Sequence, residues 1–333
     1  MTRYPRSCVA LIAIATATGC ADLESEAQLD EAASELSVSS WSAPVHVADA
    51  QRGASVASVN GTTVMVRTEC CFNGGRAADL AWHKRTSTGS WTSTVVIPGQ
   101  QSDSAVSLAG FNGSIYMVRR LSNSIYLSHF NLATSTWSTS SLLPYQSSTM
   151  PTIAAFQNQL RFVGTTPGTS QLWTATMNTS EVFSTATLIP GKYSNTRVSS
   201  AVFKGRLYLA HAQAVSNKLI YSSFDGTTWS ANQFLFIGTN GASVNTFEPT
   251  LAAVNGFLHL AHVETQANLL KWSYFDGCAW TPQVSIGTQG TYIGYSLTQA
   301  GPGLVLSTSG VSASEFTAPP APRFPPPCGV INP

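Results

Sequence analysis

The chain has 333 residues, of which 43% are hydrophobic and 10% aromatic, and its 17 Lys and Arg nearly balance its 16 Asp and Glu. The hydrophobic content is enough to fill a core, so the composition excludes a fully disordered chain. The formal charge of +1 and the lack of any basic run also exclude a nucleic-acid-binding protein that works through a charged surface.

The N-terminus is typical of an export signal. Arg3 and Arg6 precede the apolar stretch CVALIAIATAT, which is too short to span a bilayer. A Gly-Cys pair ending at Cys20 resembles the lipobox of bacterial lipoproteins, although Ala17 stands where Leu is usual. The resemblance implies that Cys20 carries a lipid; the alternative is an ordinary cleaved signal with an incidental Cys. We expect residues 1–19 to be a signal peptide and the protein to lie at the outer membrane or cell surface, or otherwise to be secreted.

Residues 20–40 form an acidic segment after the signal. They contain six of the 16 acids and no Lys or Arg. A like-charged segment without aromatic residues cannot bury enough surface to fold alone. We predict a tether that begins at the lipid anchor. This anchor would be the only attachment to a membrane, because no later stretch is long and apolar enough to span one.

A repeat fills the rest of the chain. An aromatic residue followed by Ser or Thr and a short apolar strand recurs at intervals of 50, 46, 46, 46 and 51 residues. These aromatic residues are Trp41, Trp91, Trp137, Phe183, Trp229 and Trp280. Before each of the last five we predict three more strands, the first two joined by an Asn-Gly-like turn, as in VSLAGFNGSIYMVR. Four short antiparallel strands per unit are typical of a β-propeller blade.

Five such units are complete, and the two ends of the chain supply parts of a sixth. Residues 41–47 form a fourth strand without its first three, and residues 293–317 hold three strands without a fourth. Joining the two would leave no exposed sheet edge. We therefore predict an all-β, six-bladed β-propeller over residues 41–317, closed by the N-terminal strand. A Pro-rich tail follows over residues 318–333.

The composite repeat LAAFNGxLYLAH…LIYSSFDGTTWS…IPG resembles bacterial Asp-box-type propeller repeats. The whole is similar to the six-bladed fucose-binding lectins of fungi and bacteria. The resemblance implies sugar sites between neighbouring blades, each made of an Arg, a Glu and an aromatic residue. The chain departs from that pattern, because the Arg near the start of a second strand is found at Arg161 and no predicted third strand contains Glu. Fucose is therefore not the expected sugar.

Candidate ligand-binding residues lie where the second strands end, on the face that carries the second-to-third loops. The equivalent positions there are Arg67, Arg119, Gly164, His211 and His262. Four of the five are donors beside long polar loops, as a ring of ligand pockets would require. Glu69 and Glu264, just beyond two of them, could accept hydrogen bonds from sugar hydroxyls. The alternative is that the donors join neighbouring blades by bonding backbone carbonyls, since a blade–blade contact also recurs periodically.

Every complete blade also has an aromatic residue in its predicted third strand, namely Trp82, Tyr126, Trp173, Tyr221 and Trp272. Flat aromatic faces suit sugar rings, and Tyr and Trp keep a polar end for the rim. Blades equally need large side chains between twisted sheets, so core packing is the favoured role for most of them. The aligned Trp and Phe of the fourth strands are predicted to be structural.

The sequence contains no evident catalytic centre or metal site. Its ten carboxylates outside the tether include no obvious acid–base pair, and the Arg-Ile-Pro motif of sialidases is missing. His259 and His262 are three apart on a predicted strand and so point to opposite faces. We expect no cofactor and no metal. Hydrolysis ranks below binding, although distant residues can converge in a fold.

The cysteines and the turn acids have structural interpretations. Export permits disulfides, and Cys278 with Cys328 is the preferred pair, because it would fix the tail to the fifth blade. Cys70 and Cys71 could form a strained vicinal bond. Asp225, in the stretch FDGTTW, is aligned with non-acidic residues in other blades. We interpret it as a hairpin-turn residue and not as a catalytic acid.

The function predicted from the sequence is carbohydrate binding by repeated shallow sites on one propeller face, where multivalency would raise the affinity for a dense glycan surface. The alternatives are a protein-interaction scaffold at the cell surface and a sialidase-like glycoside hydrolase. Repeated polar pockets would favour a lectin. A broad apolar patch would favour a scaffold, and one carboxylate-lined pocket would favour a hydrolase.

Overall fold

The computed structural model describes residues 45–48, 53–69, 77–235, 246–264, 269–286, 295–300, 303–308 and 313–317. The predicted signal peptide, Cys20, the tether and the tail with Cys328 lie outside these ranges, as do Cys70 and Cys71. The regular structure of the described ranges is β-strand, and no helix among them could cross a membrane. The predicted all-β class is confirmed.

Five antiparallel sheets are each built from one continuous stretch of chain, and we number them blades 1 to 5. Blade 1 contains β2 (Ala54–Val59), β3 (Thr62–Thr68), β4 (Ala78–Lys84) and β5 (Val95–Ser102). Blade 2 contains β6 (Ser107–Phe111), β7 (Ser114–Leu121), β8 (Ser124–Asn131), β9 (Thr136–Trp137) and β10 (Ser141–Gln146). Blade 3 contains β11 (Thr152–Phe156), β12 (Gln159–Thr165), β13 (Gln171–Met177) and β14 (Thr187–Tyr193). Blade 4 contains β15 (Ser199–Phe203), β16 (Arg206–Ala212), β17 (Leu219–Phe224) and β18 (Gln233–Phe234). Blade 5 contains β19 (Thr246–Val254), β20 (Phe257–Glu264), β21 (Leu269–Phe275) and β22 (Val284–Ser285).

One further sheet combines the two ends of the described chain. It holds β23 (Tyr295–Ala300), β24 (Gly303–Thr308) and β25 (Ala313–Thr317), with β1 (Val45–Ala48) antiparallel to β25. The predicted pairing between the N-terminal strand and the C-terminal strands is therefore present, with Val45 opposite Glu315. Each of the five blades is thus formed by one continuous segment, whereas this sheet combines strands from both ends of the described chain.

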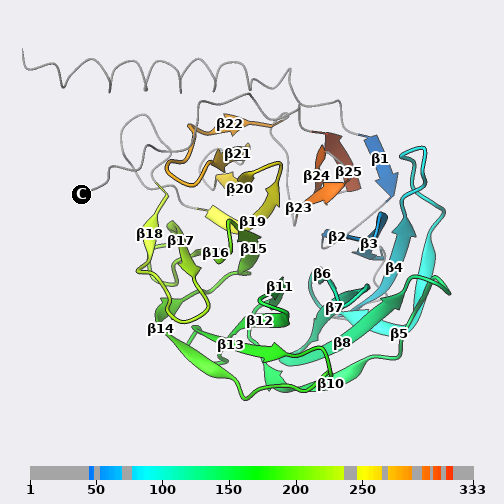
Figure 1. The fold of residues 1–333 in the computed structure, drawn as a ribbon, viewed down its shortest axis with the longest axis horizontal. Helices are drawn as coiled ribbons and strands as arrows, with labels where there is room; N and C mark the ends of the chain where they lie inside the picture. Colours follow the sequence, from blue (N-terminus) through cyan, green and yellow to red (C-terminus); the bar gives the residue numbers. More distant parts are fainter. Residues whose placement is uncertain are drawn as a thin grey trace, which may run out of the picture.

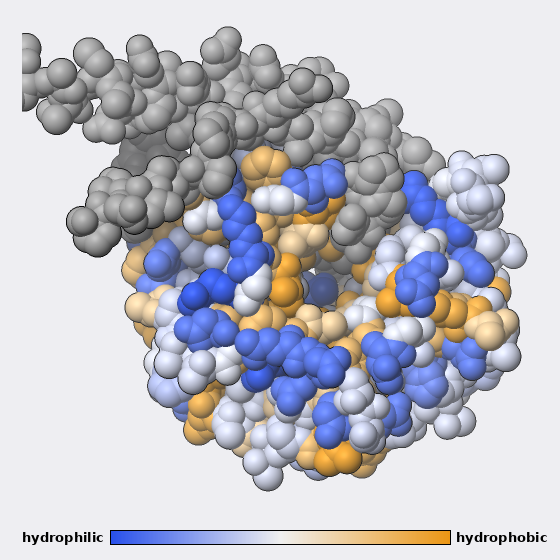
Figure 2. Space-filling model, in the orientation of Figure 1, coloured by the Kyte–Doolittle hydropathy of each residue, from blue (hydrophilic) through white to orange (hydrophobic). Residues whose placement is uncertain are grey.

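The inner strands of all these sheets surround one axis (Figure 1). Around it β2 contacts β6, β6 contacts β11, and the sequence continues through β15, β19 and β23 back to β2. These six strands line an axial cavity of about 300 Å³, with small and apolar side chains such as Ala57, Ala109 and Ala154. Figure 2 shows its narrow opening at the middle of the ring. The core lies between successive sheets, because the second strands are buried on both faces.

The first hairpin of each blade has the turn that the sequence predicts. Both central residues of these turns have positive φ, for example 48° and 77° at Asn60-Gly61 and 47° and 75° at Asn112-Gly113. In blade 3 the turn is Gln157-Asn158, at 50° and 57°. A two-residue turn of this kind matches the twist of the strands that it joins, so it sets their register.

The fourth strands begin later than predicted. The aligned aromatic residue forms an isolated bridge with the end of the third strand, as between Trp229 and Phe224, or pairs in the short β9. The outer strand then starts four residues after the aromatic, at Val95, Ser141, Thr187, Gln233 and Val284. The aromatic ring therefore closes the third-to-fourth connection, and Trp229 stacks on Phe224 at 4.8 Å between centroids.

Candidate functional site

The Arg and His side chains predicted to form a ring of ligand donors are buried. Strand register confirms that they are equivalent, since each follows the residue that pairs with a Ser or Thr of the first strand. The exposed fraction is 4% for Arg67 and Arg119 and 0% for His211 and His262. Ligands at the loops therefore meet no exposed surface of either histidine.

The two glutamates expected to accept sugar hydroxyls are held in ion pairs. Glu69 lies 3.0 Å from the guanidinium of Arg67, whose Nε also donates to His83 at 3.0 Å. Glu264 lies 3.6 Å from Lys271 Nζ in the same blade. Both carboxylates are half-buried, so a ligand would have to compete with these partners.

Burial also keeps the two histidines neutral. Desolvation lowers the pKa of both His211 and His262 to about 4. For His262 a hydrogen bond to Gln283 raises the pKa, but the effect of desolvation is larger. His262 Nε2 lies 3.2 Å from Gln283 Oε1. His211 Nε2 has no hydrogen-bond partner among the described residues. These are interior groups, whose charging would destabilise the fold.

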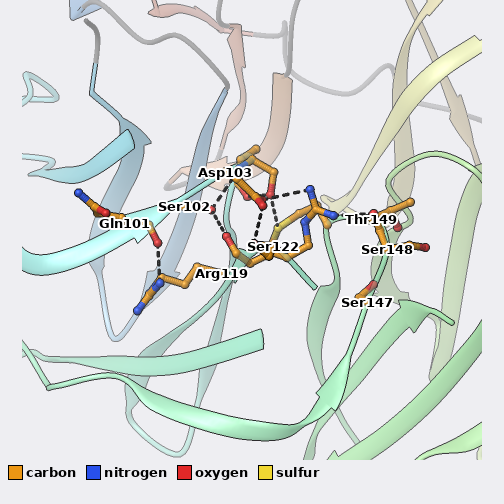
Figure 3. Close-up of polar contacts among 12 residues, drawn as sticks. Gln101, Ser102, Asp103, Arg119, Ser122, Ser147, Ser148 and Thr149 are labelled. Carbon is orange, nitrogen blue, oxygen red and sulfur yellow. Dashed lines mark hydrogen bonds and ion pairs between the residues drawn. The ribbon is translucent and has the colours of Figure 1, made fainter. Parts of the chain in front are cut away.

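Arg119 joins two blades. It extends from β7 and donates to the carbonyl of Gln101 on β5 of blade 1 (Figure 3). Its Nη2 donates to Ser140 Oγ at 2.9 Å, and its guanidinium lies 4.2 Å from the ring centroid of Tyr126. Of the two interpretations open for this position, the contacts of Arg119 fit a blade–blade link.

The five third-strand aromatic residues are not equivalent, contrary to the sequence alignment. Trp82, Tyr221 and Trp272 pair with Val66, Ala210 and Ala261. Tyr126 and Trp173 are shifted by one residue and pair with Arg119 and Gly164. Successive strand residues point to opposite faces, so the two groups face opposite neighbours. Trp82 packs on Phe130 of the next blade, whereas Trp173 packs on Tyr145 of the preceding one.

Two features show that the three tryptophans serve packing. Trp82, Trp173 and Trp272 are buried within apolar clusters between blades. Gly164 occupies the position of Arg119 and His211, and a Cβ there would collide with the ring of Trp173. Gly164, the one predicted ring position without a donor, therefore leaves space for the indole of Trp173. Tyr126 and Tyr221 are half-buried.

A recurring contact, which we call the latch, joins the outer strand of one blade to the next blade. Its donors are Gln100, Tyr145 and Lys192, at equivalent places in β5, β10 and β14. The acceptors are the carbonyls of Ser138, Ser184 and Ser230, each directly after an aligned aromatic residue. The Gln100 and Lys192 latches measure 2.8 and 2.9 Å. One backbone arrangement thus accepts an amide, a phenol or an ammonium group.

A second recurring contact uses a fully buried serine two residues after the latch. Ser102 Oγ donates to the carbonyl of Arg120 at 2.9 Å, and Ser194 Oγ donates to that of Ala212 at 3.0 Å. Ser147 Oγ instead accepts from the amide of Thr165 at 3.0 Å. These bonds hold each outer strand to the second strand of the next blade.

The Asp-Gly turns lie in the third-to-fourth connection, as predicted. Asp225 Oδ1 accepts the amides of Thr227 and Thr228, both at 2.8 Å, and these backbone bonds lower its pKa to about 2. The carbonyl of Asp225 accepts from Gln157 of the preceding blade at 3.2 Å, beside Gly226 at φ 111°. Asp276 has the same relation to Lys204. The interpretation of Asp225 as a turn residue is confirmed.

Cys278 follows the second of these turns and is disulfide-bonded. Its predicted partner, Cys328, lies outside the described residues, so this pairing stays a prediction.

A cleft lined mainly by polar residues lies between blades 3 and 4, on the face of the second-to-third loops. This 3–4 cleft has a volume of about 330 Å³ and is lined by Thr169, Ser170, Gly191, Tyr193, Asn195, Gln213, Ala214, Val215 and Asn232. Tyr193 is 43% exposed. Asn195 Oδ1 accepts from Ser170 at 2.6 Å, and its Nδ2 donates to Ala214 at 2.6 Å, so both blades hold this amide in place.

A second cavity of about 520 Å³ adjoins the 3–4 cleft, and Gly191 and Asn232 line both. We call it the lower cavity; its other lining residues are Pro190, Lys192, Thr227, Thr228, Trp229, Ser230 and Ala231. Asn232 Oδ1 accepts from Lys192 at 2.8 Å, and its Nδ2 donates to the carbonyl of Gly191 at 3.2 Å. Gly191 has φ 69° and no atom within 4 Å of its Cβ position, so the backbone between the cavities is open.

The corresponding boundary between blades 1 and 2 carries charges instead (Figure 3). There Asp103 and Arg120 form an ion pair at 3.1 Å, and Arg120 also donates to the carbonyl of Ser148. Their equivalents at the 3–4 boundary are Asn195 and Ala212, which are uncharged. Tyr193 is equivalent to Gln101 at the boundary between blades 1 and 2 and to Gln146 at the boundary between blades 2 and 3. Among these three described boundaries, an aromatic ring is found at this position in the 3–4 cleft.

The cleft is lined by hydrogen-bonding groups. Among the described residues, neither lining contains Asp, Glu or His, so the carboxylate pair of glycoside hydrolysis is not found there. The described residues contain no group of three side chains that could hold a metal ion. An amide has two N–H donors and two acceptor lone pairs, so Asn195 and Asn232 keep capacity for a ligand after their internal bonds. The repeat pattern did not indicate this site. The signal in the sequence is the Tyr of the IPGKYS stretch, where the equivalent position in blades 1 and 2 is Gln.

No family model matches the chain, and no curated protein matches it. Solved structures do match. An α-L-arabinanase of Penicillium chrysogenum complexed with arabinobiose is 10% identical, with 83% of this chain and 97% of that chain covered and a TM-score of 0.62. The SapL1 lectin in complex with alpha methyl fucoside is 14% identical, with 81% and 94% covered and a TM-score of 0.59. Trypanosoma rangeli sialidase is 13% identical, with 82% and 55% covered and a TM-score of 0.57. At these identities the likeness shows the β-propeller fold alone.

Proposed function

We propose that this protein binds carbohydrate in the 3–4 cleft. The observation that carries the proposal is one half-exposed aromatic ring beside a set of uncharged, pre-positioned amide and hydroxyl groups. Sugars present hydroxyl groups that both donate and accept, together with apolar C–H faces. An amide with one free donor and one free acceptor matches a hydroxyl, and a Tyr ring offers a flat apolar surface.

The rigidity of the site also supports binding. Asn195 is bonded to blade 3 through Ser170 and to blade 4 through Ala214. Asn232 is bonded to Lys192 and to Gly191. Side chains whose rotamers are already fixed lose little conformational entropy when a ligand binds. Binding is favoured over hydrolysis because no carboxylate lines the cleft among the residues that the structure describes.

The similar structures agree with this chemistry. They are a lectin in complex with a fucoside, an arabinanase complexed with arabinobiose and a sialidase. Propellers host many activities, so the proposal rests on the residues of the cleft and takes only its ligand class from that comparison. Sugar sites at further blade boundaries, as the sequence predicts, stay part of the proposal.

We also propose that the protein is exported and held at the cell surface by a lipid on Cys20. The apolar N-terminal stretch and the Gly-Cys pair support this localisation. Labelled palmitate should enter the wild-type protein in a bacterial host and should not enter the Cys20→Ala variant. Equal labelling of the two proteins would overturn the anchor and would leave sugar binding unaffected.

A glycan array with the full chain tests the binding function. We expect at least one glycan to bind and Tyr193→Ala to weaken that binding about tenfold, the effect of losing a single well-placed aromatic contact. Gln101→Ala changes the equivalent, exposed position between blades 1 and 2 and should leave binding unchanged. Failure of every glycan to bind would overturn the proposed function, and equal effects of the two variants would move the site elsewhere.

A further inference from the structure

Lys192 is an unusual residue in the wall of this site. Its side chain is 2% exposed, and it lines the lower cavity beside Trp229, whose ring centroid lies 5.8 Å from Nζ. Nζ donates to the carbonyl of Ser230 and to Asn232 Oδ1. Within the described part of the chain, no carboxylate forms an ion pair with it. Buried ammonium groups are normally paired, because removing a charge from water is costly.

The fold does not require this charge. Gln100 occupies the equivalent place in blade 1 and donates to the equivalent carbonyl, that of Ser138, at 2.8 Å. Tyr145 makes the same latch in blade 2. A neutral donor therefore satisfies the latch, and the positive charge of Lys192 is additional to it. The buried charge lowers the stability of the fold and is not needed for the latch. Its presence is explained if a ligand supplies the negative charge that pairs with it.

The ammonium group has one N–H to offer to such a ligand. Of its three N–H donors, two are used by Ser230 and Asn232. The lower cavity holds about 520 Å³, and no described residue that lines it is Asp or Glu. The Asp225 carboxylate beside it is held in its own turn by the amides of Thr227 and Thr228. It shares Gly191 and Asn232 with the 3–4 cleft, so a ligand can extend from Tyr193 across the open backbone of Gly191 to Lys192.

We infer that the ligand is an acidic oligosaccharide, with one sugar in the 3–4 cleft and a carboxylated sugar in the lower cavity, where its carboxylate pairs with Lys192. This inference rests on the proposed carbohydrate binding and specifies its ligand class. Lys192 is the specificity-determining residue, and Tyr193 contributes affinity for sugars whether or not they carry a charge.

Titration supports the same assignment. Burial lowers the pKa of Lys192 to about 8. His211, on β16, is the titratable group that interacts with it electrostatically, and with a pKa of about 4 this imidazole is neutral above pH 6. Affinity for an acidic sugar should therefore be constant from pH 6 to pH 7.5 and fall as the pH rises above 8. Affinity for a neutral sugar should not change over that range.

The test compares Lys192→Gln with the wild-type full chain on matched ligands. The probes are oligosaccharides that contain a uronic acid and the same oligosaccharides as methyl esters, which keep the sugar ring and lose the charge. The variant reproduces the Gln100 latch of blade 1 and should fold. We expect the wild type to prefer the acids about tenfold or more, the scale of one charge-assisted hydrogen bond, and the variant to bind acids and esters alike.

The outcomes separate this inference from the proposed function. Equal binding of acids and esters by the wild type overturns the acidic ligand and leaves carbohydrate binding in place. A preference that persists in Lys192→Gln also overturns it, because the charge then acts elsewhere. Tyr193→Ala is the matched control; it should weaken acids and esters by the same factor. No binding by any probe would contradict the proposed function itself.

Discussion

The boundary between blades 1 and 2 and the boundary between blades 3 and 4 use the same scaffold for different purposes. Both have a latch to a backbone carbonyl and a buried serine that bonds to the next blade. They differ in the groups between these fixed points. The first boundary has Gln100 in its latch and the Asp103–Arg120 ion pair at its rim. The second has a buried Lys192 and an uncharged rim with a cleft.

The comparison separates structural residues from functional candidates. Groups that recur at both boundaries stabilise the ring, because every blade must be held to its neighbour. Groups whose charge or size differs between the two boundaries are not needed to hold neighbouring blades together. By this criterion the latch carbonyls and the buried serines are structural, whereas Tyr193 and Lys192 are candidates for function.

The largest expected effect concerns His211, whose equivalent at the first boundary is Arg119. The pKa of His211 is about 4 in the folded protein, below its usual 6.5, so the unfolded chain binds the proton more tightly. The contribution of neutral His211 to the free energy of unfolding is fully present above pH 6.5. It falls by about 3 kcal/mol as the pH drops to 4. His211→Leu should remove this part of the acid dependence, measured by urea unfolding at several pH values.

Arg119→Leu is the control for that measurement. Arg119 keeps its charge over the whole range, so its replacement should lower the stability equally at pH 7 and pH 4. Wild-type and His211→Leu curves that run parallel from pH 7 to pH 4 would contradict the buried, neutral state of His211. The other buried histidines, His83, His259 and His262, are the same in the wild type and in the His211→Leu variant, so their contributions cancel in the difference.

A smaller effect of opposite sign is expected for Lys192→Gln. The pKa of Lys192 falls from 10.5 to about 8 on folding, so its charge destabilises the folded state below pH 8 and this penalty disappears as the pH rises to 10.5. The Gln variant should be more stable at pH 7 by about 2 kcal/mol, after allowance for the lost bond to Asn232. Denaturant unfolding at pH 7 and pH 10.5 measures this. A variant less stable than the wild type at pH 7 would show that the ammonium is needed for the latch.

The serine contacts should be equal at the two boundaries. Ser102→Ala and Ser194→Ala each remove a buried hydroxyl that donates to a carbonyl, at a cost of about 1 kcal/mol. The thermal midpoints of the two variants should fall by similar amounts, and sugar binding should be unaffected. A large cost at one boundary only would mean that the scaffold is not shared.

Asp225→Ala should have the smallest effect. The carboxylate is partly exposed, bonds to its own turn and lies 3.8 Å from the half-exposed Arg206 of the same blade. Gln157 contacts the carbonyl of Asp225 and not its side chain. The variant should lower the thermal midpoint less than the serine variants do and bind sugar like the wild type. Loss of sugar binding would restore Asp225 as a candidate functional acid.

The repeat made much of the fold predictable. Aligned aromatic residues and Asn-Gly turns recur because each blade must meet the same geometry, and they indicated the strands and the pairing of β1 with β25. The same periodicity is a poor guide to the site. Tyr126 and Trp173 look equivalent to the other third-strand aromatics, but a one-residue shift turns them to the opposite face.

The cleft was not predictable in the same way, because it depends on departures from the repeat. Ala212 and Asn195 replace an ion pair, and Tyr193 and Lys192 replace glutamines. Whether such replacements open a cavity depends on how side chains from two blades pack together. That packing follows from three-dimensional contacts and not from spacing along the chain.

Hydrogen exchange with a bound glycan tests the central claim most directly. The ligand should slow amide exchange in residues 191–195 and 213–215, which include most of the residues that line the 3–4 cleft. The equivalent residues 99–103 and 121–123, at the boundary between blades 1 and 2, should exchange at the same rate with and without ligand. Protection of the second set, or no protection of the first, would contradict carbohydrate binding in the 3–4 cleft.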